Sequence, residues 1–205
     1  MIEAGDFTAW LRGLLSALSG EGDSDVPCGS CTACCRGAQF VHVGPDEVDT
    51  LARIPRELLF PAPRMPRGHM VLGYDDRGWC PMLRDTADGD GGTDDPRPVC
   101  SIYEHRPRAC RVYDCRLFAA AGVAPEQPAV AERASQWEFS AGTTEQAAVR
   151  AAAAFLTERP GLLPDGATAA QRAIAAIELH DLFMHREPPA EDVVQGRLAE
   201  LTTHA

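Results

Sequence analysis

The sequence predicts an α+β fold, in which an irregular cysteine-rich half with short strands packs against a mainly helical C-terminal half. All eight cysteines lie before residue 116 of the 205-residue chain. The stretch 20–116 is rich in loop-forming residues and has little periodic apolar sequence, whereas the stretch 126–205 is alanine-rich and carries helix start signals. The length suits one domain of ordinary size, so we expect a single domain over 1–205.

An amphipathic helix is predicted over residues 6–19. Apolar residues from Phe7 to Leu18 recur there at helical spacing and form one stripe. Asp6 is a suitable N-cap and Gly20 a suitable stop. We expect this stripe to belong to the core.

In the middle of the chain, the residue pattern predicts a short helix at 46–54 and a polar, glycine-rich loop at 86–96. Because that loop separates two extended segments, Cys80 and Cys100 are expected to be neighbours across it. Short extended segments are predicted at 70–74, 79–83 and 99–103.

The C-terminal half predicts alanine-rich helices and a last helix over about 190–201. A helix with small side chains such as alanine packs closely against a neighbour but cannot form a hydrophobic core alone, so these helices need a packing partner. Capping-box patterns open two of them, Thr143 with Gln146 and Thr168 with Gln171.

The net charge of −11 argues against a nucleic-acid partner, because binding phosphates needs a basic surface. All 19 basic residues are arginine, which excludes a P-loop lysine, a Schiff-base lysine and a lysine general base. No apolar run reaches the roughly 18 residues needed to span a bilayer, and the first residues carry no basic leader. We therefore expect a cytoplasmic protein with no membrane partner.

Four cysteines fall within eight residues, in the stretch Cys-Gly-Ser-Cys-Thr-Ala-Cys-Cys. Thiols two residues apart can converge on one metal ion, whereas adjacent cysteines are expected to point different ways and seldom bridge each other. In a cytosolic protein this pattern indicates metal binding or catalysis rather than disulfides. The candidate metal ligands are Cys28, Cys31, Cys34, Cys35, Cys80, Cys100, Cys110 and Cys115.

The first cluster is also similar to the start of a ferredoxin motif, in which a cysteine followed by proline completes the ligand set. Cys80-Pro81 is such a pair. Arginines interleave the second cluster, and we expect Arg106 and Arg111 to bind the cofactor by offsetting thiolate charge and donating N–H groups to sulfur.

Histidines and carboxylates offer weaker candidates. His105 lies within the second cysteine cluster, where it can ligate a metal or remain an exposed loop residue. Glu178, Asp181 and His185 would share one face of a helix, where they can hold a hard metal or act as acid–base groups. A solvated helix face is the interpretation we favour for these three residues.

Three motifs follow one another along the chain: Cys28-x2-Cys31-x2-Cys34-Cys35, Gly78-Trp79-Cys80-Pro81-Met82-Leu83 and Cys100-x-Ile102-Tyr103-x2-Arg106-Pro107-x2-Cys110-Arg111. In this order they resemble the bacterial cysteine-cluster proteins of the zinc- or iron-chelating type, often labelled YkgJ-like, and the resemblance covers a metal-binding region at 27–116. It implies a metal centre of zinc, iron or an iron–sulfur cluster; a flagellin-lysine methylating enzyme carries a related cluster. Cys115 is an addition to the general pattern.

Two main functions follow from these observations. The ferredoxin-like run and the Cys-Pro pair favour an iron–sulfur or thiolate-iron centre that serves electron transfer or chemistry on a protein partner or small-molecule substrate. Eight thiols also divide evenly into two closed tetrahedral zinc sites with a structural or sequestering role. A thiol redox sensor that loses metal on oxidation is a third hypothesis. We favour the iron–sulfur centre.

Overall fold

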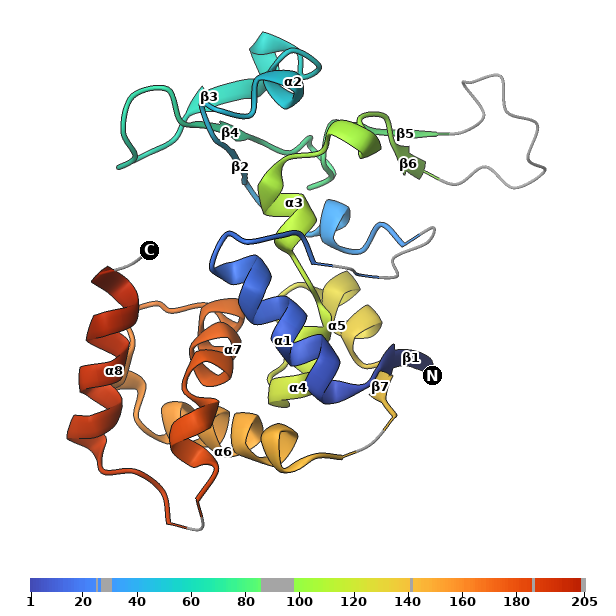
Figure 1. Cartoon of the computed structure of the whole chain (residues 1–205). Coiled ribbons are helices and arrows are strands. Elements are labelled where there is room, and N and C mark those ends of the chain that lie inside the picture. Colours follow the sequence, from blue (N-terminus) through green and yellow to red (C-terminus); the bar gives the residue numbers. More distant parts are fainter. Residues whose placement is uncertain (25, 27–30, 86–97, 141, 186, 204–205) are drawn as a thin grey trace. The chain divides into compact units, whose positions relative to one another are not determined.

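The computed structural model describes residues 1–24, 26, 31–85, 98–140, 142–185 and 187–203 (Figure 1). The chain divides into two compact units. A helical unit comprises Met1–Ser19 with Asp114–Ala205, and a cysteine unit comprises Gly20–Tyr113. Short strands in the N-terminal half and a mainly helical C-terminal half confirm the predicted α+β class. The single domain over 1–205 stays a prediction.

The helical unit combines a parallel strand pair with packed helices. β1 and β7 pair with Ile2 opposite Trp137, and α6 packs against α7 and α4. The elements are β1 (Ile2–Gly5), α1 (Phe7–Leu18), α4 (Arg116–Ala121), α5 (Pro128–Ala134), β7 (Trp137–Phe139), α6 (Thr144–Glu158), the 3₁₀ helix η5 (Pro160–Leu162), α7 (Ala169–Glu178), the 3₁₀ helix η6 (His180–Phe183) and α8 (Glu191–Thr203).

The predicted helix starts are confirmed in this unit. The Asp6 side chain accepts the Ala9 N–H at the start of α1, and Thr143 opens α6. At α7, Thr168 and Gln171 form a complete capping box, with both reciprocal hydrogen bonds present. Such caps satisfy backbone N–H groups that have no partner inside the helix, so the start is encoded locally.

The core of the helical unit joins an aromatic cluster to a buried ion pair. Phe139 lies 5.0 Å from the Phe7 ring centroid and 4.9 Å from that of Trp10. Asp114 is fully buried, and its Oδ2 accepts from Arg116 Nη2 at 2.7 Å and from Trp10 Nε1 at 2.8 Å. The two charges therefore compensate each other and tie α1 to the start of α4.

The cysteine unit is built from short elements. Its sheets have the orders β2-β4-β3 and β5-β6, all antiparallel. The elements are the 3₁₀ helix η1 (Cys34–Arg36), β2 (Val41–Val43), α2 (Val48–Leu51), the 3₁₀ helix η2 (Arg56–Leu58), β3 (Leu59–Pro61), β4 (Met70–Leu72), β5 (Leu83–Asp85), β6 (Pro98–Cys100), the 3₁₀ helix η4 (Tyr103–His105) and α3 (Arg108–Val112).

The extended segments at 70–74 and 99–103 are confirmed in part by β4 and β6, but the strand predicted at 79–83 is wrong except at its last residue. The Cys80 N–H donates to the Cys35 carbonyl at 2.7 Å, and the Leu83 N–H donates back to the Cys80 carbonyl at 3.0 Å. These bonds make a turn, so pairing with β6 begins only at Leu83, which lies opposite Cys100. The predicted loop at 86–96 lies outside the described residues.

A small apolar cluster holds the cysteine unit together. Cys80 and Cys100 both pack against it. Because the strands are three residues long, side chains from loops complete the cluster. Its buried members are Val43, Ile54, Leu72, Met82 and Ile102. No helix in the described part of the chain is long and apolar enough to cross a membrane.

We expect Asp114→Ala to lower the free energy of unfolding of the helical unit by about 3–5 kcal/mol, because it leaves Arg116 buried without its carboxylate. The matched control is Asp181→Ala, which removes an exposed ion pair with Arg197 (2.7 Å) and should cost about 0–1 kcal/mol. Urea unfolding followed by helical circular dichroism measures both. Equal losses in the two variants would contradict the structural role of the buried pair.

Candidate metal centre

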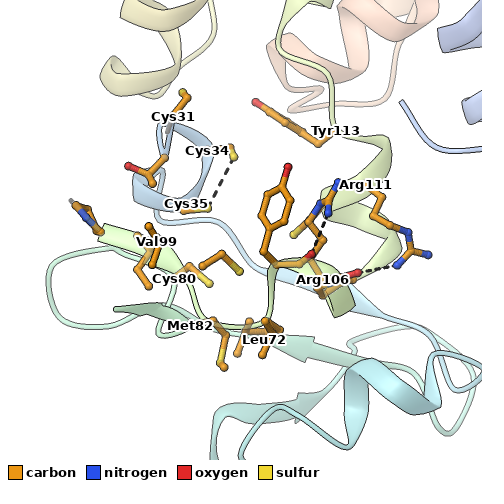
Figure 2. Close-up of a pocket in the computed structure, with 18 of the residues that line it drawn as sticks. Cys31, Cys34, Cys35, Leu72, Cys80, Met82, Val99, Arg106, Arg111 and Tyr113 are labelled. Carbon is orange, nitrogen blue, oxygen red and sulfur yellow. Dashed lines mark hydrogen bonds between the residues drawn. The ribbon is translucent and has the colours of Figure 1, made fainter. Parts of the chain in front are cut away.

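One cavity of about 300 Å³ in the cysteine unit collects most of the predicted thiols (Figure 2). The first and second motifs contribute through the segments around η1 and Cys80, and the third contributes through β6 and α3. Leu72, Met82 and Ile102 form an apolar part of the cavity wall. The cysteines lining the cavity are Cys31, Cys34, Cys35, Cys80, Cys100 and Cys110.

The remaining two predicted ligands differ from these six. Cys28 lies outside the described residues. Cys115 belongs to the helical unit, where the Trp137 Nε1–H donates to its Sγ at 3.1 Å. The predicted eight-cysteine ligand set stays a prediction.

The adjacent cysteines Cys34 and Cys35 hold their Sγ atoms 3.9 Å apart (Figure 2). The expectation that they point different ways is therefore wrong. Both lie in the 3₁₀ helix η1, where successive side chains are rotated by about 120° rather than alternating as in a strand. A separation of 3.9 Å leaves two thiols, not a disulfide, because a disulfide bond is about 2.05 Å long.

The second cysteine segment is held against the first by backbone contacts. Besides the bond from Cys80 to Cys35, the Ala38 N–H donates to the Gly78 carbonyl at 2.8 Å. Gly78 has φ +77°, and a Cβ placed there would lie 3.2 Å from the Ala38 Cβ. The close approach of the two segments thus requires glycine at this position.

A cation–π stack covers the same junction. The Trp79 ring lies between two guanidinium groups, with the Arg36 Cζ 4.7 Å and the Arg77 Cζ 4.4 Å from its centroid. Asp75 accepts the backbone N–H groups of Trp79 and Arg77 and pairs with the Arg77 side chain at 2.7 Å. The Trp79 N–H, and then the Arg77 side chain, lower the pKa of Asp75. Arg36 directly follows Cys35, and Arg77 lies three residues before Cys80, so both arginines of the stack are close in sequence to cavity cysteines.

The two arginines predicted to bind the cofactor both line the cavity. The Arg106 guanidinium lies 4.2 Å over the Tyr103 ring and donates to the Tyr103 carbonyl at 2.9 Å. Arg111 donates to Asp23 at 3.1 Å and to the Arg106 carbonyl at 2.6 Å. These donors are directed at oxygen atoms, so both arginines brace the cavity wall; their binding to a cofactor stays a prediction.

The thiols of the cavity differ in acidity. The hydrogen bond from the Cys35 side chain lowers the pKa of Cys34 to about 7, and the same bond, with burial, raises the pKa of Cys35. Burial raises the pKa of Cys110 to about 12 and is also the main cause of the raised pKa of Cys80 and Cys100. Since thiolates are the metal-binding form, a cation that binds here has to displace protons from the half-buried thiols whose pKa is raised.

The cavity gathers these thiols without focusing them on one point. Among the residues that the structure describes, no three Cys, His, Asp or Glu side chains converge closely enough to hold one metal ion. A tetrahedral zinc site, with Zn–S bonds of about 2.3 Å, needs sulfurs about 3.8 Å apart. Cys34 and Cys35 meet that spacing. The donor set as a whole is soft and suits zinc or iron.

The other predicted candidates lie elsewhere. The His105 carbonyl accepts from Thr50 Oγ1 at 2.8 Å, and the residue is not part of the cavity lining. The helix face expected to carry Glu178, Asp181 and His185 does not form, because α7 ends at Glu178. Asp181 then lies in η6 and pairs with Arg197, and burial raises the pKa of Glu178.

Two structurally important residues were not singled out by the sequence patterns. Glu47 and Asp75 each accept two backbone N–H groups beside the cysteine segments. Each follows a turn-forming stretch, Gly-Pro-Asp before Glu47 and Gly-Tyr before Asp75. That signal indicates a turn but does not reveal which distant segment the carboxylate will contact.

Comparison with known proteins identifies the family. A family model described as "CxxCxxCC: Putative zinc- or iron-chelating domain" matches residues 27–137. Neither the curated proteins nor the solved structures provide a match. The family model spans more than half of the chain and contains all three cysteine motifs, so the protein belongs to the CxxCxxCC family of zinc- or iron-chelating domains.

Proposed function

We propose that the cysteine unit binds an iron–sulfur cluster in its cavity and serves as a redox centre. The observation that carries the proposal is the spread of six cysteines around one cavity of about 300 Å³, with no three described donors close enough to share an ion. The proposal adds cluster identity and redox use to the zinc or iron chelation named in the description of the family.

The spacing of the thiols supports a cluster over a single ion. In a mononuclear site every sulfur must lie within bonding distance of one atom, which forces the sulfurs together. In a cluster, thiolates bind different irons, so they can stand further apart around a larger group. The cavity offers both the space and the separated thiols.

The surrounding residues would tune such a centre. A bound cluster supplies one-electron transfer. Leu72, Met82 and Ile102 restrict water at the apolar wall, and the Arg106 charge offsets part of the negative charge of the thiolates. We place the protein in the cytoplasm, where thiols stay reduced, with a redox protein or a small-molecule substrate as its partner.

A structural or sequestering zinc site is the second candidate function. The 3.9 Å between Cys34 Sγ and Cys35 Sγ matches the edge of a tetrahedral thiolate site, for which about 3.8 Å is expected. This observation concerns one pair of thiols, whereas the cluster accounts for the whole lining. We therefore rank zinc second.

Metal and sulfide analysis with absorption spectroscopy decides between the two. We expect protein purified without oxygen to be brown, with thiolate-to-iron charge-transfer bands, bound iron and acid-labile sulfide. Zinc has a filled d shell and gives a colourless protein. A colourless preparation that keeps about two zinc ions per chain after anaerobic reconstitution with iron and sulfide would contradict the cluster proposal.

Single cysteine substitutions test which segments share the centre. Because one cavity joins the three motifs, Cys80→Ser, Cys100→Ser and Cys110→Ser should each lower the metal-to-protein ratio as much as Cys31→Ser. Cys115→Ser, whose thiol accepts from Trp137, tests whether the eighth predicted ligand takes part, because unchanged metal content in this variant would remove Cys115 from the ligand set. Unchanged metal content in the Cys80, Cys100 and Cys110 variants would refute a shared centre.

Removal of the metal should loosen the cysteine unit first. Its apolar cluster is small and its strands are short, so ligation contributes a larger share of its folding free energy than in the helical unit. After chelation we expect limited proteolysis to cut within residues 20–113 before it cuts α6 or α7, and metal added back should restore protection. Equal protection of both units in the metal-free protein would argue against this role.

A further inference from the structure

Glu47 is a nearly buried carboxylate that contacts two separate parts of the cysteine unit. Its side chain is 10% exposed. One oxygen, Oε2, accepts the Gly44 N–H at 2.7 Å within the turn that precedes α2. The other oxygen, Oε1, accepts the Arg108 N–H at 2.5 Å at the start of α3 and lies 3.8 Å from Arg111 Nη1.

The segment that Glu47 contacts carries Cys110. In the first turn of α3, the Cys110 N–H donates to the Pro107 carbonyl at 2.8 Å, so the position of this thiol follows from the position of that turn. α3 packs against β2, just before the turn with Glu47. A hydrogen bond from a backbone N–H to a carboxylate is stronger than one to a neutral acceptor, which suits a fixed attachment point.

The same contacts reach the segment that leads into the first cysteine cluster. The Arg111 carbonyl accepts the Ser24 N–H at 3.0 Å, and the Arg111 guanidinium pairs with Asp23 at 3.1 Å. Glu47 therefore braces a helix that is itself bonded to residues 23–24. None of these contacts uses a sulfur atom or a metal.

We propose that Glu47 is a positioning residue that holds Cys110 at the cavity before any metal binds. The proposal rests on the function proposed above for the identity of the bound metal. The positioning of Cys110 by Glu47 concerns the metal-free protein alone. A carboxylate has two acceptor oxygens, and both are used here on backbone N–H groups. An amide keeps only one acceptor and presents an NH₂ group to the other N–H.

Glu47→Gln therefore leaves one of the two N–H groups without an acceptor, and so breaks the bridge between the Gly44 turn and α3 with almost no change in side-chain shape. Glu57→Gln is the matched control, because Glu57 is an exposed carboxylate in η2 of the same unit. The first measurement uses full-length metal-free protein and follows alkylation of each thiol by iodoacetamide with mass spectrometry. Cys100, which lies on β6 of the same cavity, is the internal reference.

We expect Glu47→Gln to raise the alkylation rate of Cys110 relative to Cys100 about tenfold, the effect of losing a hydrogen bond to a charged acceptor, while Glu57→Gln leaves the ratio unchanged. A general loosening of the unit would raise both rates together. The proposal is overturned if the Cys110-to-Cys100 ratio is unchanged in Glu47→Gln, whether neither rate changes or both rates rise equally.

The second measurement uses cobalt(II) as the probe, because the intensity of its thiolate charge-transfer band reports the number of bound thiolates. We expect the band per bound cobalt in Glu47→Gln to fall to that of Cys110→Ser, and the double variant to fall no further. A further fall in the double variant, or an unchanged band in Glu47→Gln, contradicts positioning of Cys110. If the unaltered protein takes up no cobalt, the metal centre itself is in question, and the alkylation ratio still decides the role of Glu47.

Discussion

The cysteine cavity depends on a backbone contact between two segments that are far apart in sequence. The Cys80 N–H donates to the Cys35 carbonyl, and the neighbouring Ala38 N–H donates to the Gly78 carbonyl. These bonds join the first and second cysteine motifs through the chain itself. The half-buried thiols of the cavity come from segments far apart in sequence, so these backbone bonds are a scaffold that brings them to one place without using a sulfur atom.

Carboxylates brace the loops of that scaffold. Asp75 and Glu47 each satisfy two backbone N–H groups in segments that have little regular hydrogen bonding of their own. A backbone N–H group left without a hydrogen-bond acceptor inside a compact unit would lower its folding stability. Arg77 and Arg111 pair with these acids, so part of the arginine content of the cysteine motifs serves to hold loops in position.

The two units are stabilised in different ways. The helical unit buries many alanines and larger apolar side chains along its helices, and the pair Asp114 and Arg116 is enclosed with its hydrogen bonds satisfied. The cysteine unit has only a small apolar cluster, which includes Leu72 and Met82, and otherwise relies on loop hydrogen bonds and the stack on Trp79. A soft-metal site fits the second kind of unit, since ligation adds the cross-links that a small core lacks.

The sequence alone determined the features that depend on neighbouring residues. Asp6 and Thr168 predicted helix starts because a cap acts within three residues, and the cysteine spacing predicted a thiolate metal site because ligand chemistry is set by residue type. Only the tertiary structure decided which thiols share the cavity, that Cys34 and Cys35 approach each other in a 3₁₀ turn, and that Glu47 braces α3. Those outcomes rest on contacts between distant segments, and a local pattern carries no information about which distant N–H or carboxylate will meet it.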